Sequence, residues 1–257
     1  MSTLTNTGAA PRFFSRLVLP LVLAAAFWPA AGHAAATIRA QLVSAAAAGI
    51  DPNAGVWNGV TEYVVTLDTI ISATGVPQLV PSTQFRSLQV KAIHDNANVY
   101  FRLRWTDTTK DVSVGDSMLF ADAVALEIPY SVNSSSIAMG NQFQPVDILY
   151  WRADMGDPVT GLGQPQNIVA GGAGTVQTSP DSDLLPTATA QVYSGGAWTV
   201  VVQRPLSGAP WVSGDLVTLT PGSTYRITFA QWDGRAKQRG PVKLVAGSWQ
   251  TLIVNAQ

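Results

Sequence analysis

The stretch Val99-Tyr100-Phe101-Arg102-Leu103-Arg104-Trp105 indicates the fold class more clearly than any other part of the chain. Its odd-numbered positions are apolar, whereas Arg102 and Arg104 occupy positions between them. A period of two is typical of a β-strand with one buried and one wetter face. The segment 87–93 alternates in the same way, and Asp95-Asn96-Ala97-Asn98 between the two segments has the composition of a tight turn. Together they predict a β-hairpin.

Short segments separated by Gly, Pro, Asn and Asp continue this pattern along the chain. We expect strands at 63–67, 123–128, 147–152, 191–193, 198–203, 225–232 and 249–254, with a second hairpin turn at Ser194-Gly195-Gly196. Only the alanine-rich stretch 41–48 has helical character. The segment 154–189, rich in Gly, Pro, Asn and Ser, predicts a long loop that covers a site or a partner, or is mobile. The predicted fold class is all-β: an antiparallel β-sandwich with long loops and a minor helix.

Residues 1–36 have the layout of a secretory signal peptide. Arg12 and Arg16 precede an apolar run at 17–28, and small residues follow up to Ala36. The run is too short to favour a membrane span. We expect cleavage near residue 34 or 36, which leaves one exported domain at 37–257.

The mature chain has few reactive side chains. The absence of Cys excludes disulfides, iron–sulfur clusters, thiolate catalysis and covalent c-type haem. His33 leaves with the signal peptide, so only His94 remains, and a multi-histidine zinc site or a bis-histidine haem site cannot form within one chain. Removal of Arg12 and Arg16 from 15 basic residues leaves 13 against 16 acidic ones, a balance of −3. This charge is too mild for a protein that binds nucleic acid or a membrane surface.

Met139 and Lys243 are the two candidate ligands that do not depend on histidine or cysteine. Met139 precedes the aromatic segment 145–154, where a methionine either fills a gap in the core or acts as a soft, neutral metal ligand. Lys243 stands between apolar neighbours in 240–245, where a lysine usually lifts its ammonium group into water. Neither residue is diagnostic by itself.

Other candidates give weaker signals. His94 follows a predicted strand and fits a structural role or that of a general base, but no nucleophile motif accompanies it. The carboxylates available for acid–base work, as in a glycosidase, or for structural and surface roles, are Asp116, Asp122, Glu127, Asp147, Asp154 and Asp233. The large rings belong to the core or line a pocket for a flat ligand, either a porphyrin or a sugar; they are Trp105, Tyr150, Trp151, Trp198, Trp211, Trp232 and Trp249.

Several motifs in a fixed order resemble one family. They are VKAIHD at 90–95 with VYFRLRW at 99–105, FADAVALEIP at 120–129, MG at 139–140 with 145–154, AWTV at 197–200 with RPL at 204–206, and FAQWDG at 229–234 with Lys243 and Trp249. This set resembles the haem b-binding gamma subunit of periplasmic molybdenum enzymes related to dimethyl sulfoxide reductase. Members of that group include ethylbenzene dehydrogenase, dimethylsulfide dehydrogenase, selenate reductase and chlorate reductase.

The resemblance implies a β-sandwich that holds one non-covalent haem b with methionine and lysine as axial ligands. Carried onto this sequence, the methionine is Met139 and the lysine is Lys243. Lys237 lies in the same interval, but its neighbours are polar, whereas those of Lys243 are apolar. Because a six-coordinate iron has no open position for substrate, the resemblance implies electron transfer and not catalysis.

The resemblance also suggests the surroundings of the haem and its partners. Arg152 is a candidate partner for a haem propionate, or a solvated surface arginine. Tyr150 or Trp151, and Trp232, are candidates to flank the ring, although strand alternation lets only one of Tyr150 and Trp151 face inward. The implied partners are an iron–sulfur beta subunit, an alpha subunit with the molybdenum cofactor, and a periplasmic cytochrome or other electron carrier.

Two readings from other classes remain. The first is an extracytoplasmic module without haem that binds carbohydrate or another small ligand on exposed tryptophans. The second is a hydrolase with paired carboxylates, for which the sequence offers no definable geometry. Fold class does not decide between them, because similar sandwiches serve several functions.

Overall fold

The structure is a computed structural model of the whole chain. It describes residues 34–256 except 46, 73–76, 81–83, 85, 116–118, 132–135, 173, 179–186 and 208–215. The chain divides into two units, Met1–Ala31 and Gly32–Gln257, and only the second contains described residues. The expected signal peptide therefore lies almost entirely outside the described residues.

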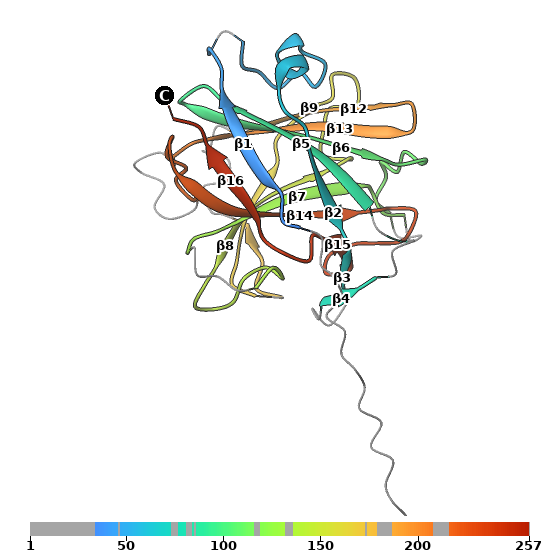
Figure 1. Cartoon of the computed structure of the whole chain (residues 1–257). Coiled ribbons are helices and arrows are strands. Elements are labelled where there is room, and N and C mark those ends of the chain that lie inside the picture. The colour runs from blue at the N-terminus through green and yellow to red at the C-terminus, as the bar shows by residue number, and fades with distance from the viewer. Residues whose placement is uncertain are drawn as a thin grey trace, which may run out of the picture. The chain divides into compact units, whose positions relative to one another are not determined.

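Two β-sheets form two layers, and one strand belongs to both (Figure 1). In the first layer, called sheet A, the order is β14-β16-β1-β5-β6-β13-β12-β9, and β2 also pairs with β5. The strands other than β14 are β1 (Thr37–Leu42), β2 (Tyr63–Leu67), β5 (Arg86–His94), β6 (Asn98–Thr106), β9 (Leu162–Gly163), β12 (Ala188–Ser194), β13 (Ala197–Pro205) and β16 (Gln250–Val254). All pairs are antiparallel except those of β1, which runs parallel to both β16 and β5.

The second layer, sheet B, has the order β11-β10-β8-β7-β14-β15-β3-β4. Its strands are β3 (Thr69–Ile71), β4 (Pro77–Leu79), β7 (Ala123–Pro129), β8 (Val146–Arg152), β10 (Gln166–Ala170), β11 (Gln177–Thr178), β14 (Thr224–Trp232) and β15 (Lys243–Val245). Residues 224–227 of β14 pair with β16, and residues 228–232 pair with β7. The strand thus passes from one sheet to the other, and its second half carries side chains of the cavity described below.

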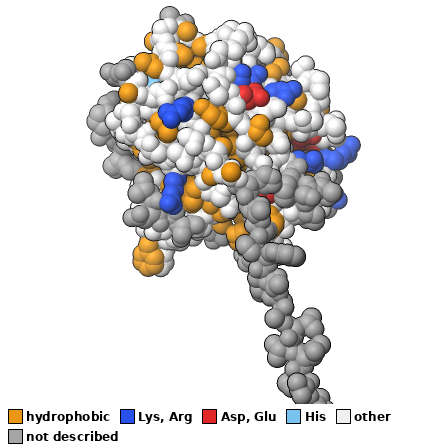
Figure 2. All heavy atoms as spheres, in the orientation of Figure 1, with side chains coloured by type: hydrophobic (Ala, Val, Ile, Leu, Met, Phe, Trp, Pro, Cys, Tyr) orange, Lys and Arg blue, Asp and Glu red, His pale blue; other side chains and the backbone are white. Residues whose placement is uncertain are grey.

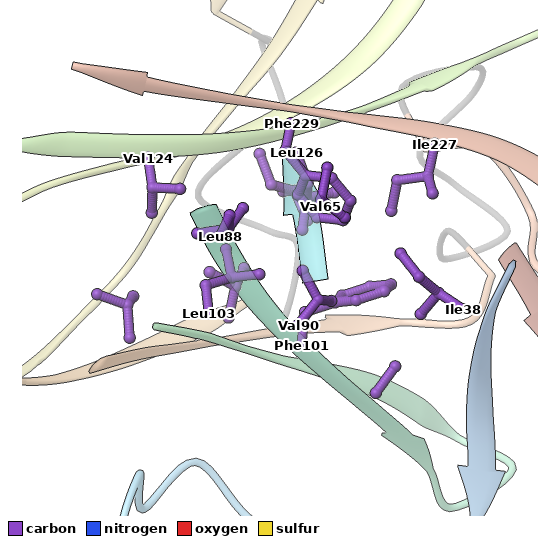
Figure 3. Close-up of a cluster of buried hydrophobic side chains, with 14 of the residues drawn as sticks. Ile38, Val65, Leu88, Val90, Phe101, Leu103, Val124, Leu126, Ile227 and Phe229 are labelled. Carbon is purple, nitrogen blue, oxygen red and sulfur yellow. The ribbon is translucent and has the colours of Figure 1, made fainter. Parts of the chain in front are cut away.

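The main core fills the space between the layers. Figure 3 shows Val124, Leu126 and Phe229 from sheet B facing Leu88 and Leu103 of sheet A. Because successive side chains of a strand point to opposite faces, Ala123, Ala125 and Glu127 of β7 lie on the outer face of sheet B. That face carries a second apolar cluster, which includes Ala125, Ile148, Ala230 and Val245.

Both predicted hairpins form. The turn between β5 and β6 has Asn96 at φ +69°, and the Asp95 carboxylate accepts hydrogen bonds from the backbone N–H groups of Ala97 and Asn98. In the turn between β12 and β13, Gly195 and Gly196 have φ of +58° and +71°, the conformation that a two-residue hairpin loop requires.

Two local expectations were wrong. The stretch 41–48 forms no helix in its described part, because its first two residues complete β1 between β16 and β5; the short helical element is instead the 3-10 turn η1 (Gly55–Gly59). In its described part, the segment 154–189 is more ordered than its composition indicates, although residues 166, 168, 174 and 176 line the cavity described below, as expected of a segment that covers a site. It contains β10, which extends sheet B by pairing with β8 along five residue pairs.

The surface carries little charge, in keeping with a content of 12% charged residues. On the face drawn in Figure 2, basic and acidic side chains lie in small separate groups among hydrophobic and neutral ones. No helix among the described residues has the length and apolar character needed to cross a membrane.

Candidate functional site

The outer face of sheet B carries a cavity of about 560 Å³. Its floor includes Ala125 of β7, Ile148 of β8 and Ala230 of β14, three adjacent strands of this sheet. Further lining comes from β3, β10 and β15 and from residues 138, 139, 174, 176, 240 and 241. Most of the lining side chains are apolar, and the volume lies within the ordinary range for a small-molecule or cofactor site.

Met139 lies at this cavity in an unusual backbone conformation. Its φ is +66°, and Gly140 follows with φ +68°. A Cβ atom on Gly140 would lie 2.5 Å from the backbone oxygen of Gln144, so only glycine fits there. The Met139 carbonyl accepts a hydrogen bond of 2.8 Å from the backbone N–H of Gly172. The Met-Gly pair therefore forms a fixed corner that places the half-buried thioether side chain against the outer apolar cluster.

Lys243 lies at the same cavity, on the short strand β15. The residue is only 5% exposed, so its amine is not the solvated group that a strand-edge lysine usually presents. Its Nζ atom lies 5.3 Å from the centre of the Trp232 ring. Burial lowers the pKa of Lys243, and the charge of Glu127 opposes this effect. Burial thus shifts Lys243 in the direction of the neutral amine, the form that can donate a lone pair to a metal.

Glu127 is the charged lining residue that the sequence did not assign to this cavity. Burial raises its pKa to about 8, against the opposing effects of Lys243 and of a hydrogen bond with the Met139 backbone. The available signal was a single acidic residue in a strand whose other members are all apolar. Glu127 therefore connects the two candidate ligands, one through its charge and the other through a hydrogen bond.

The structure separates the aromatic candidates. Tyr150 and Trp232 line the cavity with their rings edge to face at 5.1 Å. Trp151 points the opposite way and is fully buried between the sheets, where its Nε1 donates a 2.7 Å hydrogen bond to Gln191. The prediction of Trp151 as a residue that contacts the cofactor does not fit this geometry, because successive side chains of β8 point to opposite faces and only Tyr150 points toward the cavity.

Arg152 lines the edge of the cavity, but its guanidinium already forms an ion pair with a carboxylate. Nε and Nη2 donate hydrogen bonds of 2.5 and 2.9 Å to the two oxygens of Asp154, which raises the pKa of Arg152. Lys237, the competing lysine, is exposed in a turn at φ +59° and is not among the residues that line the cavity.

The other predicted acid–base candidates have structural partners. Asp147 forms a buried ion pair with Arg204 at 3.0 Å, and Asp122 accepts hydrogen bonds from Trp198 and two backbone N–H groups. Asp111, Asp122 and Asp233 place carboxylate oxygens within 4.8 Å of one another, but none of them lines the cavity. Asp116 lies outside the described residues.

His94 also lies away from the cavity. It is fully buried at the end of β5, where burial lowers its pKa. This placement favours the structural reading over a general base.

The lining fits a non-covalent haem on chemical grounds. It provides a neutral thioether and an amine whose pKa burial lowers, within a mostly apolar cavity. It provides no cysteine or histidine. Met139 and Lys243 would be the residues to hold such a group, and the apolar lining would surround its ring.

Comparison with known proteins places the chain. A sequence model described as ethylbenzene dehydrogenase matches residues 54–183. The chlorate reductase subunit gamma of Ideonella dechloratans is 30% identical over 202 residues, which cover 78% of this chain and 78% of that protein. The dimethylsulfide dehydrogenase subunit gamma of Rhodovulum sulfidophilum is 31% identical over 214 residues, which cover 77% of this chain and 73% of that protein. The chain belongs to the ethylbenzene dehydrogenase family. The resemblance to gamma subunits that its motifs predicted is thereby confirmed.

The ethylbenzene dehydrogenase family match extends over Glu127, Met139, Tyr150 and Arg152, and it ends before Trp232 and Lys243. A relative from Haloferax mediterranei, provisionally named respiratory nitrate reductase heme subunit ORF7, is 29% identical over 196 residues. This match covers 76% of the chain but 65% of the relative, slightly less than two thirds of its length.

A solved structure shares the fold. The family 9 carbohydrate binding module from Caldicellulosiruptor kristjanssonii, in complex with cellotriose, superposes with a TM-score of 0.51 at 13% identity. The alignment covers 86% of this chain and 94% of that one. At this identity the likeness concerns the fold alone.

Proposed function

We propose that this protein is a b-type cytochrome subunit that transfers single electrons through one non-covalent haem b bound in the cavity on sheet B. The observation that carries the proposal is that Met139 and Lys243, 104 positions apart in sequence, line the same cavity. The relative from Haloferax mediterranei is named as a heme subunit, which agrees with this cofactor.

In the proposed complex, two residues would bind the iron and others would surround the ring. Met139 would supply a soft, neutral ligand, which favours ferrous iron. Lys243 would supply an amine that burial already biases toward its neutral form. Tyr150, Trp232 and the apolar floor would exclude water from the ring. Haem supplies a reversible one-electron couple when bound, and two protein ligands leave no coordination position for a substrate.

The proposed setting is a multi-subunit oxidoreductase. The relatives from Ideonella and Rhodovulum are named as gamma subunits of chlorate reductase and dimethylsulfide dehydrogenase. By analogy, an iron–sulfur beta subunit and an alpha subunit with a molybdenum cofactor would be the partners on one side, and a periplasmic cytochrome or other carrier on the other. Cleavage of residues 1–36 after export would place the mature chain in the periplasm.

A haem titration of the purified protein tests the proposal. We expect binding of one haem per chain, sharp low-spin visible bands on reduction, and complete extraction of the haem into acidified organic solvent because no covalent bond holds it. Protein that stays colourless after reconstitution, and whose tryptophan fluorescence changes with added oligosaccharides, would favour the carbohydrate-binding reading instead.

The buried tryptophans weigh against that alternative. A stacking platform for sugars needs exposed rings. Among the tryptophans that the structure describes, Trp57, Trp105, Trp151, Trp198 and Trp232 are each at most 7% exposed, and Trp249 is partly buried.

A further inference from the structure

A second cavity, of about 690 Å³, adjoins the first. Tyr150, Arg152, Trp232 and Gly240 line both cavities, so the two lie on either side of these residues. The second cavity also contains Arg239 and Phe120. The apolar cavity is therefore bordered by a second cavity, called the mouth below, whose lining includes two arginines, Arg152 and Arg239.

The two arginines of the mouth differ in their partners. The guanidinium of Arg152 already binds Asp154 through two hydrogen bonds. The guanidinium carbon of Arg239 lies 4.7 Å from the centre of the Phe120 ring, which orients the group without neutralising its charge. No carboxylate of the described part of the chain forms an ion pair with Arg239. Of the two, Arg239 is therefore the one without a carboxylate partner among the residues that the structure describes.

We propose that Arg239 binds the carboxylates of the occupant of the cavity, and so fixes the acidic edge of that occupant toward the mouth. This inference rests on the proposed function, since the occupant would then be haem, a planar apolar ring with two carboxylates on one edge. A guanidinium pairs with a carboxylate through two parallel hydrogen bonds, a geometry that lysine or glutamine cannot reproduce. Arg152 stays paired with Asp154 in this arrangement.

One consequence concerns the orientation of the occupant. The mouth lies beside residues 233–242, which join β14 to β15. With its acidic edge held at the mouth by Arg239, a bound ring would present that edge on the side of the molecule where this loop lies.

A comparison of haem with haem dimethyl ester separates a loss of carboxylate recognition from a general loss of binding. Both are titrated into apoprotein of the wild type, Arg239→Gln, Arg239→Lys and Arg235→Gln. Arg235 is a matched control, because it is exposed on the same loop but lines a different cavity, beside Asp107 and Thr109. The ratio of the two affinities is compared between variants, so that differences in the solubility of the ligands cancel.

We expect the wild type to bind the diacid at least about tenfold more tightly than the diester, the scale of one hydrogen-bonded charge pair. Arg239→Gln should lose most of this preference while it keeps the affinity for the diester, Arg239→Lys should keep part of it, and Arg235→Gln should behave as the wild type. An unchanged preference in Arg239→Gln would overturn the inference alone. A wild type that binds neither ligand would overturn the proposed function, and the inference with it.

Discussion

The corner formed by Met139 and Gly140 permits a quantitative prediction. In Gly140→Ala, the new side chain must adopt φ near +68°, which costs an L-residue about 1 kcal/mol or more. Its Cβ would also lie 2.5 Å from the Gln144 oxygen and 3.1 Å from a Val146 methyl group. Relief of such an overlap costs about 1–3 kcal/mol. We therefore expect a loss of about 2–4 kcal/mol in the free energy of unfolding.

Gly195→Ala separates the two contributions. Gly195 has φ +58°, but a Cβ there meets no atom within 4 Å, so this variant should lose only about 1 kcal/mol. Denaturant unfolding of the two apoproteins measures the difference. Haem titration should in addition detect weaker binding in Gly140→Ala and normal binding in Gly195→Ala. Equal stability losses in the two variants, or unchanged haem affinity in Gly140→Ala, would refute the reasoning about this corner.

Three further predictions concern the rest of the domain. Burial raises the pKa of Asp122 from 3.8 to about 6, so its contribution to stability is complete below pH 4 and is lost as the pH rises through 6, by at most about 3 kcal/mol. From pH 4 to pH 7, the free energy of unfolding should therefore fall more in the wild type than in Asp122→Asn. Removal of the buried guanidinium in Arg204→Ala should cost about 3–5 kcal/mol in denaturant unfolding, since it leaves Asp147 without its ion-pair partner, and a loss below 1 kcal/mol would argue against the pair. Trp151→Phe should lower the melting temperature through the loss of its hydrogen bond to Gln191 but leave the haem spectrum unchanged; an altered spectrum would return Trp151 to the cofactor site.

Strand alternation accounts for most of what the sequence could predict. The apolar positions of 99–105 face the core as expected, and the Asn- and Gly-containing turns close both hairpins. Side-chain alternation along the strand requires that one of Tyr150 and Trp151 faces the outer side of sheet B. Because both residues are large aromatics, the alternation alone does not show which of them does. The pairing of β8 with β7 and β10 fixes the choice.

The sequence alone could not show which residues distant in sequence lie together in the fold. Nothing local to Met139 or Lys243 indicates that they share a cavity, since β15 reaches it through pairing with β14 and β3. The resemblance to a known family, and not spacing, supplied that pair. The ordered part of 154–189 was missed for a related reason: β10 is a strand of only five residues paired with β8, and it lies within a segment rich in Gly, Pro, Asn and Ser.

Glu127 illustrates the limit of composition as a guide. In the sequence it was one of several carboxylates without a definable partner. In the fold it is buried, close enough to Lys243 for their charges to interact, and hydrogen-bonded to the Met139 backbone. Only the arrangement of β7 against β14 and the 138–140 corner reveals this.

The central claim is that Met139 and Lys243 together ligate one haem. Visible absorption spectra of haem-reconstituted wild type, Met139→Ala, Lys243→Ala and the control Lys237→Ala, each oxidised and reduced, test it most directly. The claim predicts low-spin, six-coordinate spectra for the wild type and for Lys237→Ala, and the loss of that signature in each ligand variant. A wild-type spectrum retained in Met139→Ala or in Lys243→Ala would contradict it.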